Sequence, residues 1–130
     1  MLLQDILGQV RDFHEAFGIR GSTVPSAVIG LRAQQLRFDL MREENEEYLA
    51  AASRGDLVEV ADALGDMLYI LCGTILMHGM ADKIEAVFRE IQRSNMSKLG
   101  ADGKPIYRED GKVLKGPAFV PPDIAAALSR

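Results

Sequence analysis

An unusual group of acidic residues lies between Leu36 and Asp66, on two segments whose residue spacing predicts helices. This stretch holds nine acidic and three basic residues, a net charge of −6, whereas the whole chain has −4. Acids at helical spacing include Glu43, Glu44, Glu46 and Glu47 on the first segment, and Glu59, Asp62 and Asp66 on the second. Carboxylates grouped in this way can hold metal ions, provided that the two helices face each other.

Helical periodicity places several of these carboxylates on shared faces. Glu44 and Glu47 fall on one stripe of the first helix, while Glu46 points elsewhere. Asp62 and Asp66 form a stripe on the second helix, with Glu59 at its edge. Like charges this close raise each other's pKa unless a cation neutralises them. Hard oxygen donors without Cys or His select Mg²⁺, with Mn²⁺ as a substitute, so the predicted metal ligands are Glu44, Glu47, Glu59, Asp62 and Asp66.

The glutamates also have a simpler interpretation. A solvated helix face is the ordinary explanation for a run of glutamates. Glu59 stands three residues after Asp56, where the pair predicts a capping box. Asp62 and Asp66 differ, because they interrupt the apolar pattern of a helix that looks central. A buried, unpaired Asp is costly, which favours a paired or metal-bound role for these two residues.

The elements that must position these acids are predicted to be helices. Apolar spacing and turn residues predict helices over residues 2–17, 26–53 with a break near Gly30, 56–78 and 124–128, and a further helix that begins at Asp82. Capping is expected from Asp56, from Asp82 with Glu85, and from Asp123. The fourth helix is expected to bury Ile84, Val87, Phe88 and Ile91. The predicted fold is all-α: a four- to five-helix bundle over residues 1–99, a short irregular or hairpin-like basic arm over 100–122, and a short helix over 123–130.

Composition limits the classes of function. At 130 residues the chain is predicted to be a single domain. A net charge of −4 gives no reason to expect a nucleic-acid polymer as a partner. One cysteine, Cys72, cannot form an internal disulfide, and we expect it to be buried. The longest apolar run, Met67 to Met77, is short for a membrane span and the N-terminus lacks signal-peptide features, so a cytoplasmic protein without a membrane partner is predicted.

The chain resembles the all-α NTP pyrophosphohydrolases, the superfamily of MazG and phosphoribosyl-ATP pyrophosphohydrolase. Their E-E-x-x-E pattern is matched by Glu43, Glu44 and Glu47, and their E-x-x-D spacing by Glu59 and Asp62. Asp66 precedes Met-Leu-Tyr, as an acid does in the usual second motif, although Ala63 stands where that register would have Glu. The segments RSNMSK, residues 93–98, and DGKVLKGP, residues 110–117, are similar to a MazG-like subgroup. The resemblance covers residues 10–123.

This resemblance implies Mg²⁺-dependent hydrolysis of a nucleoside triphosphate, such as a dNTP or a non-standard NTP, to the monophosphate and pyrophosphate. Glu43, as acceptor of the water proton, and Glu44 are the implied catalytic residues, and a homodimer or homotetramer is the implied assembly. Phosphoribosyl-ATP is the alternative substrate, and a non-catalytic helical oligomer or adaptor is the alternative of another class. A ferritin-like di-iron site is set aside, since neither histidine stands three residues after a glutamate.

A basic arm follows the predicted bundle and would complete the site. Lysines on a glycine-containing loop can close over phosphates. The predicted substrate-binding residues are Asn95, Lys98, Tyr107, Lys112 and Lys115. Tyr107 could stack on a base or simply pack against the chain. His14, beside Phe13, is expected at the helix surface rather than in a base pocket.

Overall fold

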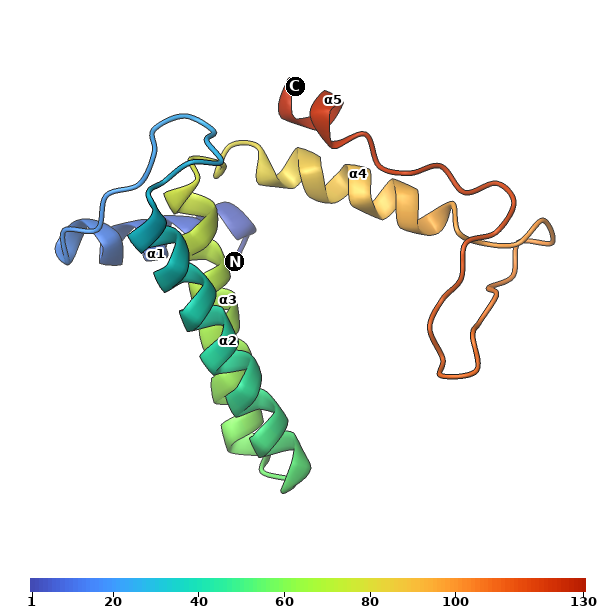
Figure 1. The fold of residues 1–130 in the computed structure, drawn as a ribbon, viewed down its shortest axis with the longest axis horizontal. Coiled ribbons are helices and arrows are strands. Elements are labelled where there is room, and N and C mark those ends of the chain that lie inside the picture. The colour runs from blue at the N-terminus through green and yellow to red at the C-terminus, as the bar shows by residue number, and fades with distance from the viewer. The chain divides into compact units, whose positions relative to one another are not determined.

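The computed structural model describes residues 1–130 and confirms an all-α chain, with an isolated β-bridge as its only extended pairing. Its helices are α1 Leu3–Ala16, α2 Leu31–Ser53, α3 Leu57–Met77, α4 Ile84–Met96 and α5 Ile124–Leu128 (Figure 1). Internal contacts divide the chain into two compact units, Met1–Ala81 and Asp82–Arg130, and each is described by itself.

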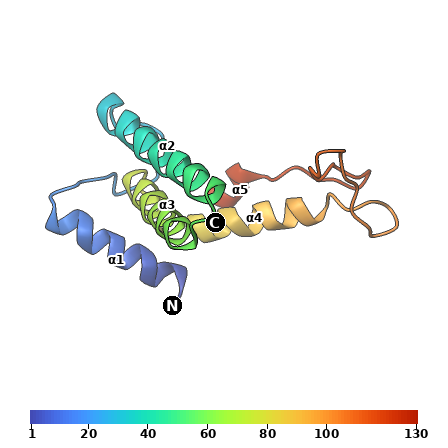
Figure 2. The same cartoon turned by 90° about the horizontal axis from the view of Figure 1, so that it is seen from below.

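The first unit is organised around the α2–α3 hairpin, whose helices lie side by side in both views (Figures 1 and 2). The turn between them uses Gly55 at φ +69°, a left-handed conformation that glycine adopts without steric cost. Asp56 caps α3 as predicted, since its side chain accepts a hydrogen bond from the Glu59 backbone N–H at 3.1 Å. This short turn makes the two acid-bearing helices antiparallel neighbours.

Helix α1 packs on α3 and supplies the best-buried side chains of this unit. Leu7 and Val10 from α1 are buried, as are Ala63 and Cys72 of α3. The buried Cys72 agrees with the expectation from its apolar surroundings. His14 corrects the sequence expectation: it is only 7% exposed, because α1 turns this face toward its neighbours rather than to solvent.

The loop between α1 and α2 is fastened to the C-terminal end of α3. Ser22 N–H donates to the Met77 carbonyl at 3.0 Å, and Ser26 N–H donates to the His78 carbonyl at 2.9 Å. Residues 26–29 are not helical, contrary to the prediction. Instead, the Ser26 hydroxyl donates to the Val28 carbonyl and accepts from the Val28 N–H. Gly30, at φ +94°, precedes the first residue of α2, Leu31. A side chain that bonds its own backbone competes with the helix here.

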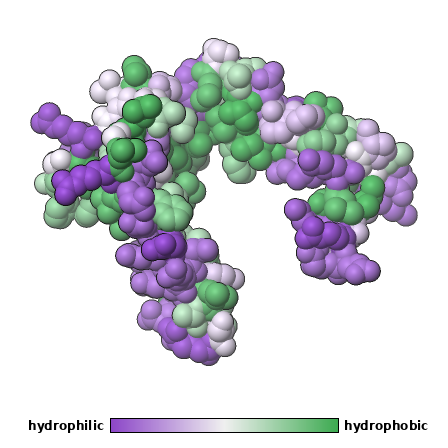
Figure 3. Space-filling view, viewed as in Figure 1, coloured by the Kyte–Doolittle hydropathy of each residue, from purple (hydrophilic) through white to green (hydrophobic).

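Much of the apolar surface of α2 and α3 is exposed. Leu36, Phe38, Leu64, Leu68 and Leu71 are each about half exposed. By length and composition alone α3 could cross a membrane, yet its most apolar window contains Asp62 and Asp66, which are costly in hydrocarbon. On the face shown in Figure 3, hydrophilic side chains predominate over much of the α2–α3 hairpin. Self-association through the remaining apolar surface stays a prediction.

The second unit pairs α4 with α5 and differs from the expected packing. α5 is capped by Asp123, as predicted, but α4 follows Lys83 without a side-chain cap, so Asp82 does not cap it. The predicted apolar stripe of α4 is wrong: Phe88 is 65% exposed, whereas Glu90 and Ser94 are buried. The physical reason is that the returning C-terminal segment covers the polar face, where Asp123 N–H donates to the Glu90 carboxylate.

The arm between α4 and α5 is hairpin-like, as predicted. Tyr107 and Val113 form an isolated antiparallel bridge. Leu114 N–H donates to the Ile106 carbonyl, and Arg108 N–H to the Lys112 carbonyl, each at 2.8 Å. The base of the arm is closed by the Gly116 N–H, which donates to the Lys98 carbonyl at 2.8 Å.

Glu90 is expected to make the second unit sensitive to acid. The Arg93 side chain donates a fork of hydrogen bonds to Glu90 and, with the Asp123 N–H, lowers the pKa of Glu90 to about 2. A depressed carboxyl pKa stabilises the fold above the unfolded-state value of 4.5 and loses this contribution as the pH falls toward 2. We therefore expect Glu90→Gln to lower the free energy of unfolding at pH 7 and to flatten its acid dependence, measured by urea unfolding between about pH 3 and 7.

The matched control is Glu85→Gln on the same helix. Glu85 is paired with Arg89 at 3.7 Å and its side chain is 42% exposed, so its loss should change stability little. An unfolding free energy that falls as steeply with acid in Glu90→Gln as in the parent would contradict the assignment.

Candidate metal centre

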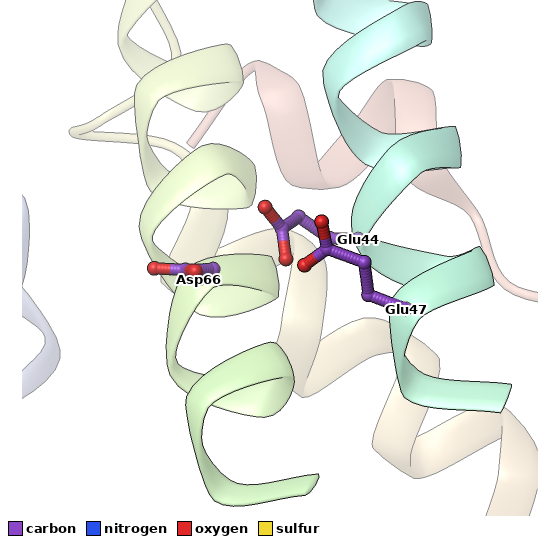
Figure 4. A group of neighbouring side chains, drawn as sticks. All are labelled: Glu44, Glu47 and Asp66. Atoms are coloured by element: carbon purple, nitrogen blue, oxygen red, sulfur yellow. The ribbon is translucent and has the colours of Figure 1, made fainter. Parts of the chain in front are cut away.

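Three carboxylates from two helices converge on the α2–α3 hairpin. Glu44 and Glu47 of α2 and Asp66 of α3 each offer one oxygen, and these oxygens all lie within 4.8 Å of one another. The two glutamates extend side by side from α2 toward α3, which carries Asp66 (Figure 4). The grouping follows from the helix period and the antiparallel hairpin together, because residues one turn apart on α2 meet the middle of α3.

The surroundings of Glu44 disfavour its charged form. The pKa of Glu44 is raised to about 7, first by burial, then by the hydrogen bond and the repulsion from Glu47, and last by repulsion from Asp66 and Asp62. Its Oε2 is buried and has no hydrogen-bond partner. An unpaired buried carboxylate oxygen is costly, so the chain by itself leaves this position unsatisfied.

The donor set fits a hard divalent cation. It consists of carboxylate oxygens, without sulfur or imidazole, which is the chemistry that Mg²⁺ and Mn²⁺ prefer. A cation bound between the helices would give the buried Glu44 oxygen a partner and offset the repulsion among the acids. The residues that could hold such an ion are therefore Glu44, Glu47 and Asp66.

The other predicted acids are placed differently. Asp62 lies near enough to Glu44 to help raise the pKa of that carboxyl, although it is outside the group of three. Glu59 is exposed in the first turn of α3, and Glu43 is exposed on α2 beside Glu44. The structure thus brings three of the five predicted metal ligands together, places a fourth nearby, and leaves Glu59 apart.

The predicted substrate-binding residues all belong to the second unit. Asn95 lies in the last turn of α4, and Lys98 follows that helix. Tyr107, 61% exposed, takes part in the β-bridge of the arm. Lys112 is exposed beside it, and the Lys115 ammonium lies 4.8 Å from the centre of the Phe119 ring. Within this unit the lysines and Tyr107 are gathered on one arm.

Sequence reasoning missed a basic pair in the first unit. His14 and Arg37 meet over Gly73, a glycine on the same face of α3 as Asp66. The seven-residue spacing from Arg37 to Glu44, and from Asp66 to Gly73, was a signal available in the sequence. An apolar pocket of about 590 Å³ also opens on the hairpin, lined by Phe38, Met41, Arg42, Asn45, Met67, Leu68 and Leu71.

The chain has the fold of the all-α NTP pyrophosphohydrolases. A solved structure from Exiguobacterium sp. 255-15, provisionally assigned as an NTP pyrophosphohydrolase, matches with a TM-score of 0.51 and 26% identity, over 96% of this chain and 94% of that one. Residues 10–95 match the phosphoribosyl-ATP pyrophosphohydrolase family, and the chain belongs to this family.

A viral relative is also similar. An uncharacterized protein of Acanthamoeba polyphaga mimivirus is 27% identical over 112 residues, which cover 82% of this chain. The match spans 45% of the length of that viral protein, so the chain corresponds to about half of it. Family membership and the structural match agree on the all-α fold of this family.

Proposed function

We propose that this protein hydrolyses a nucleoside triphosphate, a dNTP or a non-standard NTP, to the monophosphate and pyrophosphate in the presence of Mg²⁺. The observation that carries the proposal is the group of carboxylates from Glu44, Glu47 and Asp66, with one buried oxygen left unsatisfied. Phosphoryl-group chemistry requires mainly positioning and neutralisation of charge, which such a centre can supply. Housekeeping of the cytoplasmic nucleotide pool is the role that we infer.

The acidic residues have two kinds of role in this proposal, as metal ligands and as proton acceptor. Glu44, Glu47 and Asp66 would hold Mg²⁺, with Asp62 and Glu59 as further candidate ligands. Bound Mg²⁺ would neutralise phosphate charge and favour ionisation of the attacking water. Glu43, exposed beside Glu44, would accept the proton of that water.

The second unit is proposed to bind the substrate. Lys98, Lys112 and Lys115 offer ammonium groups for phosphate oxygens. Asn95 would donate hydrogen bonds, and the exposed Tyr107 ring would stack on the nucleotide. No nucleic-acid polymer is expected as substrate, given the net charge of −4.

Phosphoribosyl-ATP is the second candidate substrate, because the matched family bears the name of that activity. The arm and the RSNMSK segment favour the nucleoside triphosphate, since they are the parts of the chain that resemble the MazG-like subgroup. The two candidates share the cleavage that separates pyrophosphate from a nucleotide monophosphate.

A nucleotide panel with separate detection of pyrophosphate and phosphate tests the proposal. We expect Mg²⁺-dependent pyrophosphate release from one or a few members of a panel of common and modified NTPs and dNTPs together with phosphoribosyl-ATP. We also expect Mg²⁺ alone to raise the melting temperature, because it binds the folded carboxylate group and not the unfolded chain. Absence of turnover across the panel, with no stabilisation by Mg²⁺, would leave the helical oligomer or adaptor as the better interpretation.

A further inference from the structure

Two basic side chains meet at one point on α3. If Gly73 carried a Cβ, that atom would lie 2.8 Å from Arg37 Nη1 and 3.0 Å from His14 Nε2. The glycine therefore allows a guanidinium from α2 and an imidazole from α1 to approach the α3 backbone together. Three helices of the first unit thus build this polar junction.

Arg37 has no acidic partner at this junction. Its Nε is buried without a hydrogen-bond partner, and none of the six ion pairs of the chain includes it. Burial lowers the pKa of Arg37, with no acid to offset that effect. A guanidinium held in this state costs stability, so a ligand with hydrogen-bond acceptors would bind it favourably.

The junction and the carboxylates lie on the same side of the hairpin. Arg37 precedes Glu44 by seven residues, and Gly73 follows Asp66 by seven. Seven residues are almost two helical turns, so each pair shares a face and is separated by about 10 Å along the helix axis. That spacing suits a nucleotide whose phosphates lie at one end and whose base lies at the other.

Aromatic rings accompany the basic pair. The Phe13 ring, next to His14 on α1, meets the Tyr69 ring of α3 edge to face at 5.6 Å, and each of these residues is 41% exposed. Phe17, 69% exposed, lies 4.4 Å from Phe13 between ring centres. Accessible rings beside unpaired donors form the kind of surface on which proteins hold a nucleobase.

We propose that Arg37 and His14 bind the acceptor edge of the nucleobase, with Phe13 and Tyr69 as the apolar surface beside it. The assignment rests on the proposed function, which places the phosphates at the carboxylates. A guanidinium has donors only, so it selects a base with two neighbouring acceptors, such as O6 and N7 of guanine or N3 and O2 of cytosine. Adenine, whose amino group is a donor, fits less well.

The state of His14 favours a base over a phosphate at this junction. Burial, followed by repulsion from Arg37, lowers the pKa of His14 and so favours the neutral imidazole. A neutral ring offers one donor and one acceptor but no charge for an anion. The pair is therefore better suited to recognise a base through hydrogen bonds than to bind a phosphate through charge.

The test is binding rather than turnover, measured by calorimetry with Mg²⁺. The probes are α,β-methylene analogues of the four dNTPs, together with inorganic tripolyphosphate, which has phosphates and no base. The variants are Arg37→Gln, Arg37→Lys and His14→Gln, with Arg42→Gln as control, because Arg42 is an exposed arginine of α2 that lines the apolar pocket. Arg37→Lys keeps the charge without the planar fork, and melting curves verify folding.

We expect both Arg37 variants to bind the preferred analogue about 10- to 100-fold more weakly, because charge-assisted hydrogen bonds to the base are lost. Their affinity for tripolyphosphate should change by less than about twofold. His14→Gln should alter the preference among bases. Equal losses for tripolyphosphate would place a phosphate at Arg37 and overturn the proposal. Equal affinity of the parent protein for all four analogues would also overturn the proposal. A loss of analogue affinity in Arg42→Gln alone would overturn it too, because it would put the base in the apolar pocket. Analogue binding with no pyrophosphate release from natural nucleotides would refute the proposed function and leave the base site standing.

Discussion

Asp66→Asn is expected to reduce Mg²⁺-dependent pyrophosphate release by about 10²- to 10³-fold, with the helical fold intact. The substitution keeps the size of the side chain and removes the charge that α3 contributes to the group with Glu44 and Glu47. Glu47→Gln should have a similar effect from the α2 side. The measurement is the initial rate of pyrophosphate release against Mg²⁺ concentration, with circular dichroism of each variant.

Glu46→Gln provides the matched control for these two variants. Glu46 lies on α2 beside Glu47, yet its side chain is 72% exposed and pairs with Arg42 at 3.8 Å, outside the carboxylate group. Its activity should stay near that of the parent. Wild-type rates in Asp66→Asn or Glu47→Gln would remove that residue from the site, whereas loss of the helical signal would make its role structural.

Gly79→Ala is expected to destabilise the protein by about 3 kcal/mol or more, which combines backbone strain with a direct collision. Gly79 has φ +66°, and a Cβ there would stand 2.2 Å from the Val24 carbonyl oxygen. That oxygen belongs to the loop fastened to the end of α3, so relief of the collision would shift backbone rather than a flexible side chain. Urea unfolding with linear extrapolation measures the change.

Gly55→Ala separates the two contributions. Gly55 has nearly the same backbone conformation, at φ +69°, but a Cβ there would meet nothing within 4 Å. Its substitution should therefore show the conformational cost alone, about 1 kcal/mol. Similar losses in the two variants would mean that the loop moves aside and that its attachment to α3 contributes little to stability.

The carboxylate group was predictable because it depends on local regularities. A helix of 3.6 residues per turn places Glu44 and Glu47 on one face whatever else the chain does. Gly55 and Asp56 mark a short turn, and a short turn between two long helices makes them antiparallel neighbours. These local features are sufficient to predict the all-α fold and the packing of α2 against α3. To place Asp66 near the two glutamates, only the register between the two helices is needed in addition.

The basic junction was not predictable, because it depends on which face α1 turns toward α3. From the sequence, His14, beside Phe13, was expected at the helix surface. In the structure Leu7, Val10 and His14 are buried, while Phe17 is 69% exposed. Two competing stripes of similar hydrophobicity differ by little free energy, so long-range packing decides between them.

The same limit explains the second unit. The sequence by itself determined the helices, their acidic stripe and the hairpin-like arm, because spacing, caps and turn residues act within a few residues along the chain. Only the tertiary structure decided that α4 buries Glu90 and Ser94 and leaves Phe88 exposed, and that Arg37 has no acidic partner. Burial of a charged residue depends on partners distant in sequence, here Asp123 for Glu90 and Gly73 for Arg37, which no local pattern identifies.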